Sequence, residues 1–404
     1  MVTSGSPWLR SLLRAGKKQQ RSAARALTDL LAPPKRKPAA KAKAKAGAKP
    51  TLRKPATSNA LVAKPKLAAK PRPASKPRPA RPALLAGREA LAPLSPAGGK
   101  WLAAHYAAHS AALSGHAAMQ ARRMPYWLYL PITPAPPSGL PLIVMLHGCD
   151  QSATLFAEGT RMNQLADKAG YAVLYPQQSA HVHPQRCWKW YDRATQQGGG
   201  DVPLIVGLLA KVMDGYPIDR SRVYICGISA GAAMAHIVAL NHPHLFAALG
   251  MHSGPLYGAG HSTMGALAVM KHGNSARVDP AIAELKARRP AFPAMPTMLI
   301  GGEADEIVRP VNQAQLTRQA MLLNALPADA PVRLVLKAGN KRNLPYRLHD
   351  VFRGRKLMLR VAQVAGLKHA WSGGDPRLSF NSGPGPDASK MLLAFFGKHR
   401  RLIR

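Results

Sequence analysis

Hydrophobic positions in this chain follow two alternating patterns after about residue 123. Short apolar runs rich in β-branched residues alternate with longer segments whose apolar residues recur at helical spacing. The run Leu140–Leu146 is apolar throughout, which is typical of a central strand in a parallel sheet. Strands are predicted at Tyr126–Leu130, Leu140–Leu146, Tyr171–Tyr175, Val223–Cys226, Ala247–Met251, Thr297–Ile300, Val332–Leu336 and Leu357–Val364. Helices are predicted at Thr160–Lys168, Val202–Met213, Ala230–Asn241, Val311–Leu323 and Ala388–Phe396. The alternation predicts an α/β domain, a doubly wound and mostly parallel sheet with helices on both faces.

A serine stands at one of the predicted strand-to-helix turns. The strand Val223–Cys226 runs into Gly227-Ile-Ser229-Ala-Gly231, and small helix-forming residues follow directly. A sharp turn of this kind strains the serine backbone and leaves room only for glycine on either side. The serine hydroxyl is then held clear of the sheet edge, above the free N–H groups of a helix N-terminus. This arrangement predicts that Ser229 is a nucleophile.

A nucleophilic serine needs a histidine as base and a carboxylate that orients the histidine. Asp305 follows the predicted strand Thr297–Ile300 in a loop, where catalytic groups gather in open α/β sheets. Glu303 and Glu306 lie in the same loop and compete for the role of the acid. His369 follows the last predicted strand, so strand end, loop position and the chain order Ser, Asp, His all favour it among the histidines.

Attack of a serine on a carbonyl also requires hydrogen-bond donors for the oxyanion that forms. The strand Leu140–Leu146 ends in His147-Gly148-Cys149, a glycine turn of the kind that supplies a backbone donor. The second donor is expected from the residue after the nucleophile. We therefore predict an oxyanion hole formed by the N–H groups of Cys149 and Ala230, and expect His147 to order the loop.

Six motifs occur in an order that resembles the polyhydroxybutyrate (PHB) depolymerase-type esterases, which are α/β-hydrolases similar to feruloyl and acetylxylan esterases. They are Gly148-Cys149-Asp-Gln-Ser152, Gly159-Thr-Arg-Met-Asn163, Cys187-Trp-Lys-Trp190-Tyr, Gly227-Ile-Ser229-Ala-Gly231, His252-Ser-Gly254 and His369-Ala-Trp-Ser-Gly-Gly374. The resemblance runs from about Tyr126 to Phe396 and implies hydrolysis of carboxylic esters without cofactor or metal. It implies the triad Ser229, Asp305 and His369.

The resemblance also implies where the substrate binds. Trp190 is expected to wall the acyl-binding cleft, with Trp371 as a second aromatic wall. Two departures from the family pattern stand out: Lys368 precedes the histidine where family loops often have glycine, and a separate C-terminal polymer-binding module is not expected. We therefore favour short-chain hydroxyacyl esters and soluble oligomers of polyhydroxybutyrate over granule erosion, with feruloyl or acetylxylan esters as the alternative.

The chain has three cysteines, too few for a disulfide framework. Cys226 lies on the strand before the serine and is expected to be buried. Cys149 and Cys187 flank the predicted site from two loops, and we hypothesise that they are close enough to form a disulfide. In a reducing cytoplasm they would remain thiols.

The positive charge is concentrated at the N-terminus. The formal net charge is +39, and residues 1–100 contribute +22 of it, from 24 basic and two acidic residues. Residues 1–90 are predicted to be a disordered Lys/Ala/Pro-rich tail, in which Trp8–Leu31 could form a short amphipathic helix. Residues 91–122 are predicted to be a helical lead-in to an esterase domain over residues 123–404.

Such a tail would attract polyanions, a storage granule or an anionic membrane without sequence specificity, and no specific nucleic-acid motif accompanies it. An alternative function of another class is therefore an anionic-surface or nucleic-acid-binding protein. The sequence has no run of eighteen apolar residues and no apolar signal-peptide core. These features favour a cytoplasmic location, with an extracellular one, common in the family, as the alternative.

Overall fold

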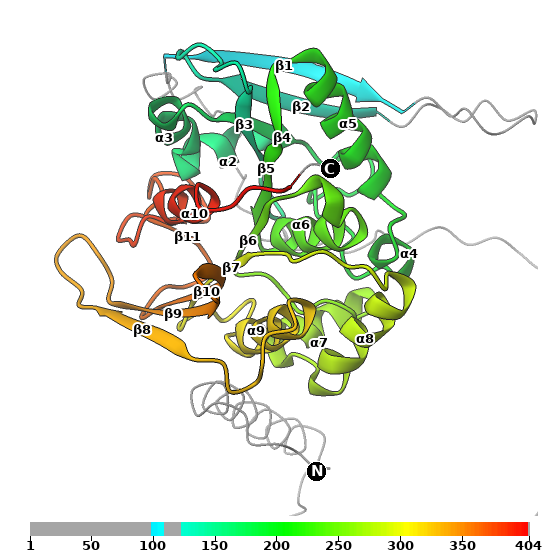
Figure 1. Cartoon of the computed structure of the whole chain (residues 1–404), viewed down its shortest axis with the longest axis vertical. Coiled ribbons are helices and arrows are strands. Elements are labelled where there is room, and N and C mark those ends of the chain that lie inside the picture. The colour runs from blue at the N-terminus through cyan, green and yellow to red at the C-terminus, as the bar shows by residue number, and fades with distance from the viewer. Residues whose placement is uncertain (1–97, 109–122, 403–404) are drawn as a thin grey trace, which may run out of the picture. The chain divides into compact units, whose positions relative to one another are not determined.

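The computed structural model describes residues 98–108 and 123–402, and within them the chain is organised around one ten-stranded sheet (Figure 1). The strand order is β1-β2-β4-β3-β5-β6-β7-β10-β9-β8. The strands are β1 (Lys100–Ala107), β2 (Arg123–Leu130), β3 (Leu140–Leu146), β4 (Ala172–Pro176), β5 (Ile218–Ile228), β6 (Ala248–His252), β7 (Thr297–Gly302), β8 (Val332–Lys337), β9 (Tyr346–Arg353) and β10 (Lys356–Val364). The six central strands, from β4 to β10 in this order, are parallel, and the strands at both edges are antiparallel.

Helices cover both faces of the sheet, as the sequence predicts (Figure 1). One layer contains α5 (Val202–Gly215), α6 (Ala230–Asn241) and α9 (Val311–Leu323), and the other contains α2 (Ala153–Thr160), α3 (Met162–Ala169) and α10 (Ala388–Phe396). Successive side chains of a strand point to opposite faces. Accordingly, Leu142 and Val144 of β3 join the hydrophobic cluster on one face, whereas Ile143 and Met145 join the other. The doubly wound α/β architecture is confirmed.

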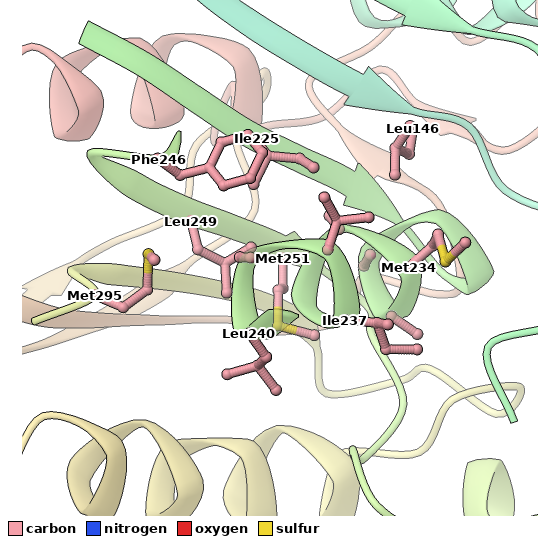
Figure 2. Packing of buried hydrophobic residues seen from close by; sticks show 14 of the residues in the cluster. Leu146, Ile225, Met234, Ile237, Leu240, Phe246, Leu249, Met251 and Met295 are labelled. Carbon is pink, nitrogen blue, oxygen red and sulfur yellow. The ribbon is translucent and has the colours of Figure 1, made fainter. Parts of the chain in front are cut away.

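Helix α6 begins at the nucleophile turn and lies within the hydrophobic core. All twelve of its residues are buried, so it has no solvent-exposed face. Figure 2 shows Met234, Ile237 and Leu240 of this helix among the packed side chains of the cluster. Met234 and Ile237 belong to the same buried cluster as Ile225 of β5 and Leu249 of β6. Burial of each such side chain contributes about 1.5–3 kcal/mol, so packing fixes the helix, and with it the turn at its N-terminus.

The helix predicted over residues 91–122 is wrong where the structure describes that segment. Residues Lys100–Ala107 form the edge strand β1, which pairs antiparallel with β2. Leu102, Ala104 and Tyr106 are more buried than the residues between them, which is the twofold period of a strand. Among residues other than glycine and proline, helix propensity differs by only about 0.7 kcal/mol, and pairing with β2 overrides the preference of alanine.

Strand β9 is absent from the sequence prediction, and it pairs antiparallel with both β8 and β10.

The basic tail predicted for residues 1–90, including the helix Trp8–Leu31, lies outside the described residues. Among the residues that are described, no helix is both long enough and apolar enough to cross a membrane.

An insertion between β6 and β7 carries further helices, which follow the carboxyl end of β6. It contains α7 (Thr263–His272), the short 3-10 helix η2 (Ser275–Arg277) and α8 (Val278–Arg288), and both α-helices pack against α9. A further short helix, α4 (Arg193–Gln196), lies in the loop before α5. These elements provide walls at the carboxyl ends of the parallel strands.

Candidate active site

Ser229 occupies the sharp turn between β5 and α6. Its backbone has φ 56° and ψ −125°, a conformation that a residue with a side chain rarely adopts. The turn is held by a hydrogen bond that the Ser229 N–H donates to the carbonyl of His252, at 2.9 Å. A β-carbon on Gly227 would lie 2.5 Å from the carbonyl oxygen of Leu146, and one on Gly231 would collide with the same strand end. Close approach of three backbone segments therefore requires both glycines of the motif.

Asp305 and His369 meet at the ends of two neighbouring strands. The Nδ1 atom of His369 is 2.8 Å from Oδ2 of Asp305; the side chain of Asp305 is almost fully buried, whereas that of His369 is partly exposed. The second carboxylate oxygen of Asp305 accepts hydrogen bonds from the backbone N–H groups of Ile307 at 3.0 Å and Val308 at 2.8 Å. The carboxylate is thus fixed in orientation and is aimed at one nitrogen of the imidazole.

The competing carboxylates of the same loop do not contact His369. Glu303 is exposed and pairs with Arg347, and Glu306 is also exposed. Ser229 and His369 line one cavity of about 400 Å³, although no hydrogen bond joins the serine hydroxyl to the imidazole. Such bonds are often long in a free enzyme and shorten when substrate binds.

Two backbone N–H groups face the same cavity. Cys149 and Ala230 both line it, and no described residue accepts a hydrogen bond from either N–H. The turn that carries Cys149 is ordered because the Gly148 N–H donates to Oε1 of Gln151 at 2.8 Å and the Asp150 N–H donates to the carbonyl of Gln185 at 2.6 Å. Cys149 and Ala230, the residues expected to supply the oxyanion donors, therefore line the same cavity as Ser229.

His147 is buried behind this turn. Its Nδ1 lies 2.7 Å from the carbonyl oxygen of Gly148, and its Nε2 accepts a hydrogen bond from the N–H of Gln178 at 3.1 Å. Burial lowers the pKa of His147 to about 4, so the imidazole is neutral at pH 7. It therefore holds the loop in place, as expected from the sequence.

A disulfide joins Cys149 to Cys187, which confirms the hypothesis of a bridge. It ties the turn with the predicted oxyanion donor to the segment with Trp188 and Trp190. The indole of Trp188 donates to the carbonyl of His147 at 2.9 Å, which adds a second tie between the same two segments. Cys226 is buried and free, and burial raises the pKa of its thiol.

We expect oxidised, denatured protein to show one reactive thiol, that of Cys226, and reduced protein to show three. Closing a loop between residues 38 apart stabilises the fold by about 4 kcal/mol on the chain-entropy model, so reduction should lower the unfolding midpoint. Thiol titration in denaturant and thermal unfolding with and without reductant measure both effects. Cys226→Ala is the matched control and should leave no reactive thiol before reduction; three thiols in the unreduced parent protein would contradict the bridge.

The walls of the cavity are mostly apolar. Trp190 lines it, as predicted, and its ring packs edge-on against Tyr191 at 5.7 Å. Sequence reasoning missed several further apolar walls, among them Leu267 and Met270 of α7, Ile307 and Phe380. Helix α7 has no clear hydrophobic period, and Ile307 and Phe380 lie in loops, so the sequence carried little signal for their role.

Trp371 does not line the cavity, so its prediction as a substrate contact is wrong. It is fully buried, packs edge-on against Phe156 at 5.4 Å, and donates its indole N–H to Ser389 at 3.1 Å. It also stacks on His252, with ring centroids 5.1 Å apart. A large aromatic residue beside a catalytic histidine fills the core as readily as it lines a cleft, and the sequence does not distinguish the two.

His252 is a site residue whose role the sequence did not reveal. Its carbonyl accepts a hydrogen bond from the N–H of Ser229. Its Nε2 accepts one from the N–H of Ser372, three residues beyond His369. Burial, followed by the charge of His369, lowers the pKa of His252 to about 3, so it is neutral. His252 thus connects the nucleophile turn to the histidine loop. Within the described residues, no cluster of three or more His, Cys, Asp or Glu side chains could hold a metal.

Comparison with known proteins places this arrangement among esterases. The family model described as "Esterase PHB depolymerase" matches residues 124–343. The poly(3-hydroxyalkanoate) depolymerase C of Paucimonas lemoignei is 32% identical over 138 residues, which are 34% of this chain and 33% of that protein. Feruloyl esterase B of Neurospora crassa is 36% identical over 115 residues, 28% of this chain and 38% of that protein.

Acetylxylan esterase A of Talaromyces purpureogenus is 32% identical over 130 residues, 32% of this chain and 33% of that protein. The chain thus spans about a third of the length of these relatives. Among solved structures, the acetyl xylan esterase from Aspergillus awamori superimposes with a TM-score of 0.56 at 19% identity, covering 68% of this chain and 94% of that one. This likeness shows the α/β-hydrolase fold.

Proposed function

Because the chain belongs to the esterase PHB depolymerase family, we propose that it is a serine esterase that hydrolyses carboxylic esters through an acyl-enzyme intermediate. One observation carries the proposal. The hydrogen-bonded pair Asp305–His369 opens onto the cavity that contains Ser229 and two backbone N–H groups without a described acceptor. Nucleophile, base, orienting acid and oxyanion donors are all required for acyl transfer, and these four kinds of group meet at one place.

In the proposed mechanism, Ser229 Oγ attacks the ester carbonyl carbon while Nε2 of His369 takes the hydroxyl proton. The carboxylate of Asp305 keeps the proton of His369 on Nδ1 and stabilises the imidazolium that forms. The carbonyl oxygen becomes an oxyanion and accepts hydrogen bonds from the N–H groups of Cys149 and Ala230. His369 then protonates the leaving alcohol, and a water molecule repeats the sequence to release the acid and regenerate Ser229.

The substrate is proposed to be a short-chain hydroxyacyl ester, such as a soluble oligomer of 3-hydroxybutyrate. A cavity of about 400 Å³ with walls of Trp190, Leu267, Met270 and Ile307 favours a small apolar acyl group. Its volume is near the lower end of the range for small-molecule sites. A feruloyl ester, with one aromatic ring, or an acetylated xylan is the alternative within the same family.

A side-by-side assay of hydroxybutyrate oligomers, amorphous polyhydroxybutyrate, methyl ferulate and acetylated xylan tests the substrate class. We expect the highest kcat/KM on the soluble oligomers, because each further methylene or ring must fit between the same apolar walls. A preference for methyl ferulate by about tenfold or more would reverse the ranking, since about 1.4 kcal/mol of transition-state binding would then favour the aromatic acyl group.

We also propose that the basic N-terminal segment binds anionic surfaces, on the strength of the +22 charge within residues 1–100. Deleting residues 1–90 should leave kcat/KM on p-nitrophenyl butyrate within about twofold of the parent, because every proposed catalytic residue lies beyond residue 140. The same deletion should flatten the salt dependence of binding to DNA or anionic vesicles, because fewer counterions are released. If binding by the parent and by the deletion variant depended equally on salt, the proposal that the N-terminal segment binds anionic surfaces would be refuted.

A further inference from the structure

A second hollow lies beside the ester cleft, between α4 and α8. Its volume is about 340 Å³. Arg277, Ala281, Glu284 and Arg288 are spaced by four, three and four residues, so they form one stripe along α8 that faces the hollow. Arg193 of α4 lies in the opposite wall. Tyr257 and Gly258, which precede α7, complete the lining together with neighbouring polar residues.

One of the three arginines is fixed by its own partners. Arg277 pairs with Glu284 through two parallel hydrogen bonds of 2.8 Å and donates from Nε to the carbonyl of Gly258 at 2.9 Å. The hydrogen bond from Arg277 is the largest effect that lowers the pKa of Glu284, and the charges of Arg288 and Arg193 lower it further. All three guanidinium groups therefore lie close to one carboxylate, whose charge Arg277 already neutralises.

The other two arginines leave a surplus of positive charge. Arg193 and Arg288 are exposed, and within the described ranges neither forms an ion pair with a carboxylate. Three arginines and one glutamate give these four side chains of the hollow a net charge of +2. Guanidinium groups bind carboxylate and phosphate oxygens with two parallel hydrogen bonds, so two of them on opposite walls suit a single oxyanionic group.

The hollow is separate from the ester cleft but shares a wall with it. Tyr191 and Thr263 line the ester cleft, and their hydroxyl groups are 3.5 Å apart. Arg193 lies two residues after Tyr191, and His261 lies two residues before Thr263; both line the second hollow. We propose that the hollow between α4 and α8 binds a small oxyanion, the carboxylate of a soluble hydroxy acid or an inorganic phosphate, through Arg193 and Arg288.

Isothermal titration of the full chain with inorganic phosphate, at about physiological ionic strength, tests the site. The variant R193Q/R288Q removes both guanidinium groups, and K341Q/R342Q removes two exposed charges from the loop between β8 and β9 as a matched control. We expect saturable binding of one phosphate by the parent and the control, weakened at least about tenfold in R193Q/R288Q. Equal affinity of both variants, or no saturable binding by the parent protein to phosphate or to 3-hydroxybutyrate, would overturn the proposal.

A kinetic comparison shows whether the bound oxyanion is part of the substrate or a separate anion. Of the two experiments, only this one rests on the proposed esterase activity. If the hollow holds a carboxylate of the substrate, R193Q/R288Q should raise KM for the dimer of 3-hydroxybutyrate about tenfold and leave KM for its methyl ester unchanged. If it holds a separate anion, both KM values should stay unchanged while phosphate binding is lost. Phosphate titration does not depend on hydrolysis, so failure of the anion site and failure of the esterase proposal give different results.

Discussion

Ser229→Ala is expected to lower kcat on p-nitrophenyl butyrate about 10⁶-fold, because no other hydroxyl can form the acyl-enzyme at this position. Alanine has the same β-carbon as serine, so it meets the same backbone strain at φ 56° and should leave the fold unchanged. KM should change little, because the apolar walls that bind the acyl group remain. Turnover and thermal unfolding, measured on the same preparation, separate loss of chemistry from loss of structure.

Ser221→Ala is the matched control for this variant. Ser221 lies near the start of the same strand, β5, and is buried. Its hydroxyl donates to Oδ1 of Asp219, two residues before it, far along the strand from the catalytic turn. It should keep nearly full activity despite some loss of stability. A fluorophosphonate probe should label the parent and Ser221→Ala at Ser229 and should not label Ser229→Ala. Substantial turnover or labelling in Ser229→Ala would refute the mechanism.

The chain order of the motifs predicts that Ser229, His369 and an acid from the loop after β7 meet at one edge of the sheet. Ser229, Asp305 and His369 each follow a strand of the parallel sheet, and parallel strands end at one edge, so their loops converge there. Chain order alone left Glu303 and Glu306 as competitors of Asp305, because all three carboxylates of that loop follow the same strand, and the family resemblance favoured Asp305. The deciding facts are the hydrogen bond to His369 and the ion pair between Glu303 and Arg347.

The errors have a common physical origin, since burial depends on neighbours that are distant in the sequence. Lys100–Ala107 is alanine-rich and has helical propensity, but β2 offers it an edge to pair with. Trp371 was predicted to contact substrate, yet His252 and Phe156, more than a hundred residues away, enclose it. Arg193 and Arg288 of the second hollow lie 95 residues apart in the sequence and form no motif.

Asp305→Asn is expected to lower kcat about 10⁴-fold, and the structure supplies a specific reason. Oδ1 of Asp305 accepts hydrogen bonds from the N–H groups of Ile307 and Val308, so the amide oxygen of an asparagine must occupy that place. The NH₂ group of the asparagine must then face Nδ1 of His369. Because NH₂ is a donor, Nδ1 can only accept a hydrogen bond from it and cannot carry a proton. The imidazole proton is thereby forced onto Nε2, the nitrogen that has to take the proton of Ser229.

The predicted tautomer change gives this variant a signature beyond lost activity. In ¹⁵N-detected spectra of the imidazole, the parent should carry its proton on Nδ1 of His369 and Asp305→Asn should carry it on Nε2, while thermal stability stays close to that of the parent. Glu303→Gln and Glu306→Gln are the matched controls, because each removes a carboxylate from the same loop without touching His369. They should retain activity within about twofold, as expected for exposed carboxylates outside the cavity. A loss in either control as large as that in Asp305→Asn would transfer the role of the orienting acid to that glutamate and would show that the loop rearranges when substrate binds.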